Sequence, residues 1–447
     1  MRSRPRPARL RTWETVMIPI FRSTDTKNLQ RVLRSGETQL KKAEAAARRI
    51  LNDVRRDGDS ALGRWTLQLD KIDLAKEGFT VKRREIVKAY RQVPEGFVDA
   101  VQTSARNIRK ASREQLPRAW QITNGPGIEV SQMVRPLSRV ACYVPGGRFP
   151  LPSTVLMSVI PAQVADVEEI YITSPRPAPA VLVTADILGI KKIFRLGGAQ
   201  AIGAFAYGTE SVPRADKIVG PGNRYVAAAK KLVAGDCGID FVAGPSELMV
   251  VASEGNAEWI ASDLVAQAEH DPDAVAIFLT PSRKLAFEVQ GAVEKILEQV
   301  FAGETDVPAK ALKGHGAVVV TKDLEEAIDL VNDFAPEHLT LLGGAARMLD
   351  RVRSAGSIFL GETSPVAAGD YASGTNHILP TAGAARLRGG LSAADFVKTI
   401  SVQKLTPQGL GRIGKTITTL ARAEGLKAHA YSIETRFKAN GSTPKGR

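Results

Sequence analysis

The sequence predicts an α/β protein with open, mostly parallel sheets, two of them in tandem. The main observation is that short β-rich runs alternate with amphipathic helical runs from residue 120 onward, as in sheets whose parallel strands are joined by helices. The chain also lacks an internal repeat of short period, and its 44% hydrophobic content is that of an ordinary globular protein. The length of 447 residues is enough for two or three domains with real cores.

The individual elements follow from the hydrophobic period and from the glycines and prolines between them. The expected strands are 140–144, 169–173, 193–196, 217–219, 248–251, 274–279 and 317–320. The expected helices are 154–164, 181–188, 201–207, 226–233, 259–270, 285–300 and 324–334. Residues 25–116 are also expected to be helical. The chain after Gly389 and Gly390 is expected to be helical to its end, with 413–423 as the longest segment.

The bulk composition favours a cytoplasmic protein. No apolar run approaches the roughly 18 residues that a membrane span needs. Residues 1–16 carry five arginines and no apolar core, which excludes a secretory signal and favours a disordered basic extension over a transit peptide. Two cysteines, Cys142 and Cys237, do not make a disulfide framework, which fits a reducing compartment.

The net charge of +14 raises the question of nucleic acid. Much of this charge lies in the two ends of the chain and in the stretch 105–118, where aromatic residues do not interleave with the basic ones. A single-strand binding platform would need such aromatics, so solvated helix faces and tails are the better interpretation. We therefore expect no nucleic-acid partner.

Three glycine-containing turns follow expected strands, at 145–147, 197–200 and 220–223. Glycine lets backbone N–H groups approach a phosphate, and a following helix N-terminus favours an anion. None of the three is Gly-x-Gly-x-x-Gly, and each one alone is as easily a plain strand–helix turn. Their succession at strand ends, where ligands collect in such sheets, favours a nucleotide site.

Four of the five histidines lie in polar settings. Gln267 and His270 are three residues apart at the end of an expected helix, so both side chains can face one ligand. Asp370 and His429 could complete a tetrahedral N/O site for a metal. The alternative for this pair is a helix C-terminal histidine beside a hydrogen-bonded glutamine.

Glu337 and His338 follow Pro336, which predicts a turn at a helix end. Their ordinary pKa values suit two different proton transfers. The alternative is a surface turn that ends in a histidine. His315, among glycines, is expected to be a loop or strand-entry residue. Cys142 could be a nucleophile toward an aldehyde, but its apolar strand favours a buried, inert thiol.

From residue 143 to residue 429 the chain closely resembles the histidinol dehydrogenase family. The matching strings follow the order and approximate spacing of the family. They lie at 143–148, 151–157, 197–202, 217–223, 243–247, 267–271, 334–339, 369–374, 376–377, 424–426 and 428–429. The first hundred residues fit more loosely, and residues 1–16 do not fit.

The resemblance implies an intertwined homodimer with shared active sites that oxidises L-histidinol to L-histidine through histidinal, with two NAD molecules and one zinc ion per subunit. It implies that Glu337 and His338 are catalytic. The implied zinc ligands are Gln267, His270, Asp370 and His429, the last from the partner subunit. The implied substrate contacts are these four ligands, His338, Ser246, His377 and Glu424, and the implied NAD contacts are Tyr143, Gln200 and Asn223.

The family's incomplete Rossmann-like sheets imply a domain plan for this chain. The expected parts are a basic extension (1–16), a first α/β domain with the helical N-terminal region (17–142 and 246–391), a second, NAD-binding α/β domain (143–245), a small dimerisation segment (392–418) and a C-terminal helical tail that reaches the partner's active site (419–447).

The chain departs from the family pattern at three positions in or near the implied site. Thr375 stands where the family usually has proline, Ala382 replaces a usual glycine, and Phe149 is bulkier than the usual small residue. An alternative function is a zinc- and NAD-dependent dehydrogenase of the same fold that acts on another diol or amino alcohol. Glu424 and His377 favour histidinol, because they match family contacts to that substrate.

Overall fold

The computed structural model describes residues 17–33, 38–146, 150–301 and 305–439. The basic extension 1–16 and Phe149 therefore lie outside the described residues. The chain forms two compact units. The first comprises Met1–Gln115 and Leu137–Phe396, and the second comprises Leu116–Pro136 and Val397–Arg447.

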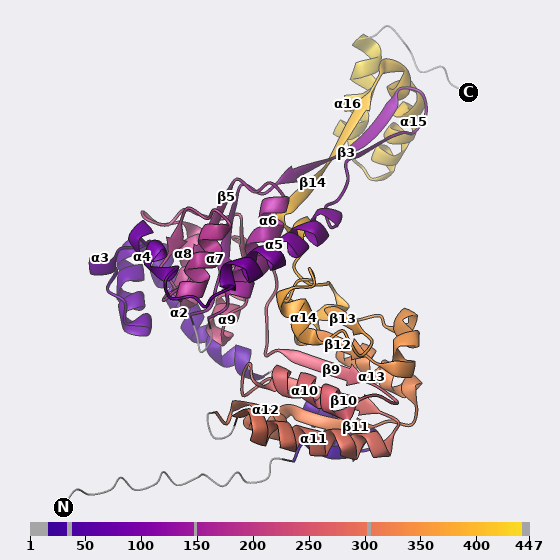
Figure 1. Cartoon of the computed structure of the whole chain (residues 1–447). Helices are drawn as coiled ribbons and strands as arrows, with labels where there is room; N and C mark the ends of the chain where they lie inside the picture. The colour runs from indigo at the N-terminus through magenta and orange to yellow at the C-terminus, as the bar shows by residue number, and fades with distance from the viewer. Residues whose placement is uncertain (1–16, 34–37, 147–149, 302–304, 440–447) are drawn as a thin grey trace, which may run out of the picture. The chain divides into compact units, whose positions relative to one another are not determined.

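The first unit contains a six-stranded sheet in which every neighbouring pair is parallel (Figure 1). In spatial order its strands are β1 (Ile20–Arg22), β11 (Gly316–Val320), β10 (Val275–Thr280), β9 (Glu247–Val251), β12 (His338–Leu341) and β13 (Ser357–Leu360). Helices cover both faces. They are α1 (Thr26–Leu33), α10 (Ala257–Ala268), α11 (Arg283–Phe301), α12 (Val307–His315) and α13 (Leu324–Phe334).

Alternate residues of β9 enter different cores, as the period of two in a strand requires. Leu248 and Val250 pack with α10, α11 and α12 on one face. Met249 and Val251 pack with α13 and with Val32 of α1 on the other. The sheet is therefore a buried central layer, which explains why its strands are nearly continuous apolar runs.

The five-stranded sheet of the first unit is also entirely parallel. Its spatial order is β6 (Ile193–Phe194), β5 (Glu169–Thr173), β4 (Arg139–Tyr143), β7 (Lys217–Val219) and β8 (Gly238–Ile239). Together the two sheets confirm the predicted α/β class with tandem parallel sheets.

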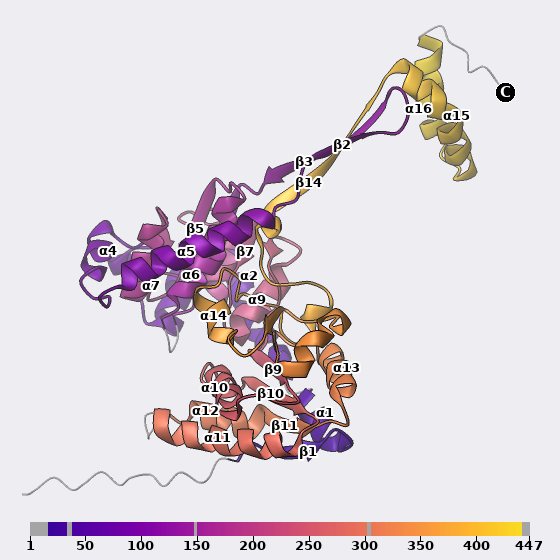
Figure 2. The same cartoon turned by 45° about the vertical axis from the view of Figure 1, so that its right-hand side comes forward.

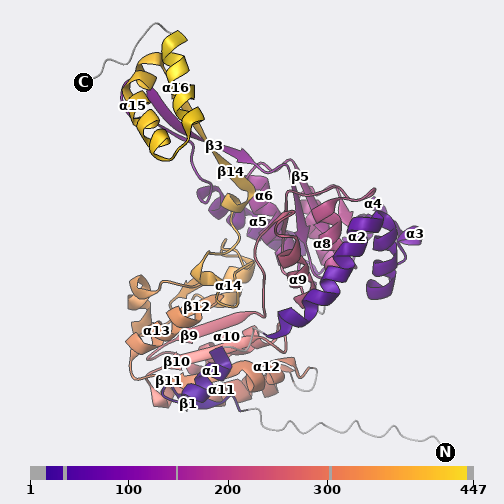
Figure 3. The ribbon, with the colours of Figure 1, turned by 180° about the vertical axis from the view of Figure 1, so that it is seen from behind.

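Helices also flank both faces of the five-stranded sheet. The helices α2 (Thr38–Asp70), α3 (Leu74–Glu77), α8 (Gly198–Tyr207) and α9 (Arg224–Val233) share one core with this sheet (Figure 3). The helix α6 (Pro152–Val164) contacts β4 and β5, and α5 (Phe97–Glu114) and α7 (Pro179–Ile187) pack against α6. The helix α4 (Arg83–Ala89) contacts α7.

The second unit is built on an antiparallel sheet of β14 (Val397–Leu405), β3 (Ile128–Pro136) and β2 (Trp120–Thr123) (Figure 2). The helices α15 (Pro407–Ala423) and α16 (Lys427–Ala439) follow β14. The expectation that the chain is helical throughout after Gly390 is wrong over 397–405, because this segment pairs along its whole length with β3.

Shorter elements complete the first unit. They are the helix α14 (Val366–Tyr371) and the 3-10 turns η1 (Gly343–Arg351), η2 (Ala384–Arg386) and η3 (Ala393–Phe396). His315 is the last residue of α12 and directly precedes β11, so its prediction as a strand-entry residue is confirmed and its prediction as a loop residue is wrong. Among the described helices none combines the length and apolarity that crossing a lipid bilayer requires.

Candidate active site

Glu337 and His338 lie at the amino-terminal edge of the six-stranded sheet. His338 is the first residue of β12, and its backbone is in register with Leu248 of the neighbouring strand β9. The turn predicted after the helix is present, since Ala335 ends α13 in the left-handed conformation, with φ 57°. The surface-turn alternative is wrong, because only 6% of Glu337 and 4% of His338 is exposed.

The Glu337 carboxylate is held by the start of β9. Its Oε2 accepts hydrogen bonds from the Ser246 hydroxyl at 2.5 Å and from the Glu247 backbone N–H at 2.8 Å. The same oxygen lies 3.5 Å from His338 Nδ1. Charge-assisted bonds of this kind fix the orientation of a carboxylate strongly.

The His338 ring is oriented by a carbonyl oxygen, which can only accept. Nδ1 lies 3.1 Å from the backbone oxygen of Glu247, so Nδ1 carries a proton and donates it to this bond. In the neutral ring the lone pair is then on Nε2, which is buried without a hydrogen-bond partner and lies 3.7 Å from Asp370 Oδ1. Burial disfavours the charged imidazole, but Glu337 and Asp370 outweigh it and raise the pKa of His338 to about 10.

Asp370, in α14, connects His338 to two further histidines. Burial would raise the pKa of Asp370, but the close approach of His338 and the fields of His377 and His270 hold this pKa below its usual value. His377 Nδ1 lies 3.1 Å from the backbone oxygen of Asp370, and its Nε2 lies 3.4 Å from the Thr154 hydroxyl. Burial lowers the pKa of His377.

Gln267 has the features of a ligand-facing amide. It lies in the last turn of α10, which contacts α14, and His270 follows two residues after the helix ends. Only 3% of Gln267 is exposed, yet its Nε2 has no hydrogen-bond partner. Nε2 is a donor, so its lack of a partner calls for an acceptor; only the amide oxygen of Gln267 could bind a cation.

The described residues contain no group of three or more His, Cys, Asp or Glu side chains arranged around one point. Of the four ligands implied by the resemblance, only His270 and Asp370 are of these types and belong to the first unit. The set of amide oxygen, imidazole nitrogens and carboxylate oxygen suits zinc chemically. The observation that fits such an ion is that His270 lies near enough to Asp370 for its field to lower the pKa of that carboxyl, so an imidazole and a carboxylate are close together in the first unit.

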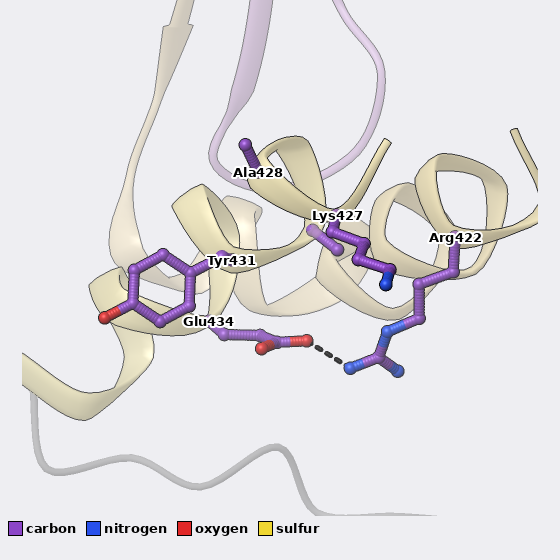
Figure 4. Close-up of a pocket in the computed structure, with 6 residues that line it drawn as sticks. Arg422, Lys427, Ala428, Tyr431 and Glu434 are labelled. Carbon is purple, nitrogen blue, oxygen red and sulfur yellow. Dashed lines mark hydrogen bonds and ion pairs between the residues drawn. The ribbon is translucent and has the colours of Figure 1, made fainter. Parts of the chain in front are cut away.

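Glu424 and His429 belong to the second unit, and both are exposed. Glu424 directly follows α15, and His429 is in the first turn of α16. Near them the two helices form a hollow of about 470 Å³, with an ion pair between Arg422 and Glu434 (Figure 4). Its full lining is Arg422, Lys427, Ala428, Ala430, Tyr431 and Glu434.

The three residues expected to contact NAD lie at the carboxyl ends of strands of the five-stranded sheet. Tyr143 ends β4, Gln200 is in the first turn of α8, and Asn223 caps α9 just after β7. Strand order reverses between β4 and β7, and such a point is where ligands bind in doubly wound sheets. The Tyr143 hydroxyl accepts a hydrogen bond from the Gly198 N–H at 3.1 Å, which joins the end of β4 to the turn before α8.

Sequence reasoning missed two carboxyl residues of these sites. Glu247 supplies the backbone groups that hold Glu337 and His338, and burial, with the Glu337 charge, raises the pKa of its own carboxyl to about 8. Asp70, at the end of α2, accepts a hydrogen bond from Gln200 Nε2 at 2.9 Å. Glu247 stands beside Ser246 in a motif already singled out, whereas nothing local marks Asp70, 130 residues before its partner.

Two of the unusual residues lie in described loops. The Thr375 hydroxyl lies 3.3 Å from the Gly369 carbonyl oxygen and 3.1 Å from the Ser373 hydroxyl. Ala382 has φ 54°, a left-handed conformation that favours the usual glycine, and its N–H donates to Glu247 Oε1 at 2.9 Å. The nucleophile hypothesis for Cys142 is not supported, since the thiol is fully buried and burial raises its pKa to about 12.

Comparison with known proteins is decisive for the family. The sequence model of histidinol dehydrogenase matches residues 33–437. The chain belongs to the histidinol dehydrogenase family. Members of this family are oxidoreductases of histidine biosynthesis.

Individual members are similar over nearly their whole length. The histidinol dehydrogenase of Methanothermobacter thermautotrophicus is 46% identical over 397 residues, which cover 87% of this chain and 92% of that protein. The enzyme of Brucella suis biovar 1 is 42% identical and covers 94% of this chain and 100% of its own. The crystal structure of histidinol dehydrogenase from Elizabethkingia anophelis has a TM-score of 0.90 at 36% identity and covers 96% of this chain and 100% of that one.

Proposed function

We propose that this chain is a zinc-dependent histidinol dehydrogenase that oxidises L-histidinol to L-histidine through L-histidinal, with two molecules of NAD. The observation that carries the proposal is the pairing of Glu337 and His338 at one sheet edge, each fixed by a different group of β9. Such an arrangement suits two successive oxidations, because an alcohol and an aldehyde need different proton transfers.

In the first oxidation His338 is the base. Its Nδ1 is committed to the Glu247 carbonyl, so Nε2 is the atom that takes the alcohol proton while hydride leaves the adjacent carbon. The ring must be neutral for this role, and its pKa of about 10 predicts faster oxidation at alkaline pH. A cation held by Asp370 would remove part of the negative field that favours the imidazolium and would bring this pKa down.

In the second oxidation Glu337 takes a proton from water, whose oxygen adds to the aldehyde carbon. His338 then takes the hydroxyl proton of the hydrate while the second hydride leaves. Bound NAD supplies the hydride acceptor for both steps, and a bound zinc ion supplies the fixed orientation of the substrate's polar groups. One alcohol and one water thereby give one carboxylate, two NADH and three protons.

We assign zinc to Gln267, His270 and Asp370 together with His429 of the partner subunit. Support comes from the proximity of His270 to Asp370 and from the N/O donor set. We assign Ser246, His377 and Glu424 to the substrate and Tyr143, Gln200 and Asn223 to NAD. Because Glu424 and His429 are exposed at the end of one helix and the start of the next, we infer that they complete the site of a partner subunit in a homodimer.

The test is the yield of NADH from L-histidinol at alkaline pH with zinc-loaded protein. Two NADH per histidinol are expected, and chelation of zinc should abolish the reaction. No NADH from L-histidinol would contradict the proposal and favour the alternative, a dehydrogenase of the same fold for another diol or amino alcohol. A yield of one NADH per L-histidinol would indicate a simple alcohol dehydrogenase.

A further inference from the structure

The turn after β7 contains a glycine that no other residue could replace. Gly220 has φ 114°, and a Cβ added to it would lie 2.1 Å from the carbonyl oxygen of Tyr143. The turn ends at Asn223, whose Oδ1 accepts hydrogen bonds from the N–H groups of Tyr225 and Val226 at 3.0 and 3.2 Å and so caps α9. The backbone of this turn is therefore fixed at its end by the helix cap.

The start of the turn is fixed by a buried ion pair between Lys230 of α9 and Asp240, just after β8. Asp240 Oδ2 accepts from the Gly220 N–H at 2.7 Å, and Lys230 Nζ donates to the Gly220 carbonyl at 3.0 Å. Both polar atoms of the Gly220 backbone are thus bonded to the two members of one pair. Asp240 Oδ1 also accepts from the Phe241 N–H at 2.7 Å.

The pair is almost completely withdrawn from water, with side-chain exposures of 2% for Lys230 and 0% for Asp240. Removing two charges from water costs about as much as their attraction returns, so a buried pair adds little net stability compared with apolar residues. The pair does fix the conformation of the turn, because each charged group has defined backbone partners. The presence of the pair at this turn is therefore better explained by the shape of the turn than by stability.

Further contacts hold the segment that carries Asp240. Arg388 donates to the backbone oxygen of Asp240 and, at 2.6 Å, to the Asp395 carboxylate. The ring of Phe241 has Lys230 Nζ 5.8 Å and the Arg388 guanidinium 5.3 Å from its centroid, within the range of cation–π attraction. The pair is thus enclosed by packed and bonded groups.

We propose that Lys230 and Asp240 are positioning residues for dinucleotide binding: they hold the Gly220 peptide so that the turn 220–223 keeps the shape that binds NAD. This inference rests on the proposed function, because it takes the turn with Asn223 to be an NAD contact. Neither side chain touches the dinucleotide. They act through Gly220 alone.

The test compares NAD binding and turnover in the full-length protein and in the double variant Lys230→Met/Asp240→Asn. The double variant is chosen because Lys230→Met alone leaves a buried carboxylate without its partner, which threatens folding. In the variant we expect the Kd for NAD, measured by calorimetry, to rise about 10-fold or more. The kcat at saturating NAD should change less than 3-fold, and the KM for L-histidinol should not change.

The matched control is Lys231→Met, the next residue of α9, which is half exposed and pairs with Glu44. It should bind NAD as the unaltered protein does. A folded double variant whose Kd for NAD stays within twofold overturns the positioning role, as does a uniform loss of all parameters in proportion to the unfolded fraction. If the unaltered protein oxidises L-histidinol, such results leave the proposed function intact. If it binds no NAD, both proposals fail.

Discussion

At the scale of single residues, two adjacent side chains are held by two different groups of β9. A backbone N–H and a hydroxyl hold the Glu337 carboxylate, whereas a backbone carbonyl holds the His338 ring. Donors stabilise a carboxylate as an anion, and an acceptor fixes which ring nitrogen keeps its proton. The proposed division of labour, in which the Glu337 carboxylate activates water and His338 deprotonates the alcohol, rests on this difference.

The variant Glu337→Gln tests that division. We expect oxidation of L-histidinal to slow at least 100-fold, since a general base contributes about 10²–10⁴. Oxidation of L-histidinol to the aldehyde should slow less than 10-fold, because it needs no activated water. Single-turnover formation of NADH from each substrate separates the steps. The control is Glu325→Gln on the exposed side of α13, and equal slowing of both steps would remove the role from Glu337.

Asp263 of α10 predicts a pH-dependent stability. Burial raises the pKa of its carboxyl from 3.8 to about 6, so the folded state binds its proton more tightly than the unfolded state. Stability is therefore lost as pH rises from 3.8 to 6, and above pH 6 the loss is complete. In urea unfolding, Asp263→Asn should gain about 1–2 kcal/mol at pH 7.5 and less at pH 5. The control is the exposed Asp350→Asn, whose effect on the free energy of unfolding should not differ between the two pH values. If the gain in Asp263→Asn were also the same at both pH values, the raised pKa of Asp263 would not be its cause.

Ala382 has a strained backbone, because its φ of 54° lies in the left-handed region. A non-glycine residue in the left-handed region costs about 1–2 kcal/mol, and glycine returns about 0.4–1 kcal/mol of that through the entropy of the unfolded chain. Ala382→Gly should therefore raise the free energy of unfolding by about 0.5–1 kcal/mol. Ala384→Gly, two residues on in η2, should lower it. Urea titration checks both, and a destabilised Ala382→Gly would contradict the strain.

At the scale of elements, the sequence predicted what is local and missed what pairs over distance. Most of the alternation from 140 to 334 is predictable because most strands there are buried apolar runs, whereas the two-residue strand β8 and the helix α12 are not predicted. The strand β14 is not predicted from the sequence because its partner β3 is far away in the chain and five of its nine residues are polar, namely Lys398, Thr399, Ser401, Gln403 and Lys404. Its Val, Thr and Ile residues were the available signal.

The candidate site likewise has residues that local sequence reveals and contacts that it does not. His270, Glu337 and His338 stand out in short polar strings, and their assignment required the resemblance of those strings to a family. The support behind them is non-local, as in the contact of Glu247 with His338 and of Asp70 with Gln200. No periodicity in the sequence marks such contacts, because they depend on which strands become neighbours in the sheet.

The helix α5 supports the loop that follows Asp370. The Ser104 hydroxyl donates to the Tyr371 carbonyl, and Asn107 Nδ2 donates to the Ala372 carbonyl at 2.8 Å. Ser104→Ala should loosen the loop and weaken zinc binding about 10-fold, the lower end of the effect of removing an outer support of a ligand. Competition with a chromogenic chelator measures this affinity. Ser112→Ala, equally buried two turns along α5, is the control, and equal losses in both would indicate a general effect of the helix.

At the scale of the whole molecule, the two parallel sheets use opposite edges. The five-stranded sheet places the turns expected to bind NAD at the carboxyl ends of its strands, as doubly wound sheets usually do. The six-stranded sheet instead places Ser246, Glu337 and His338 at the amino ends of β9 and β12. Helix α10 runs back against its strands, so its last turn carries Gln267 to that same amino edge. The residues proposed for catalysis therefore lie at one sheet and those proposed to bind NAD lie at the other.

The second unit supplies the last prediction, because it carries two proposed site residues on exposed surface. If His429 completes the site of a partner subunit, His429→Ala and His338→Ala homodimers should each be inactive. In a heterodimer of the two, one site has His338 of the first variant and His429 of the second, and the other site carries both lesions. About half of the unaltered activity per dimer should then return. Differently tagged subunits allow the heterodimer to be purified and its NADH production measured. Mixing either variant with itself is the control, and no recovery in verified heterodimers would place His429 with its own subunit's site.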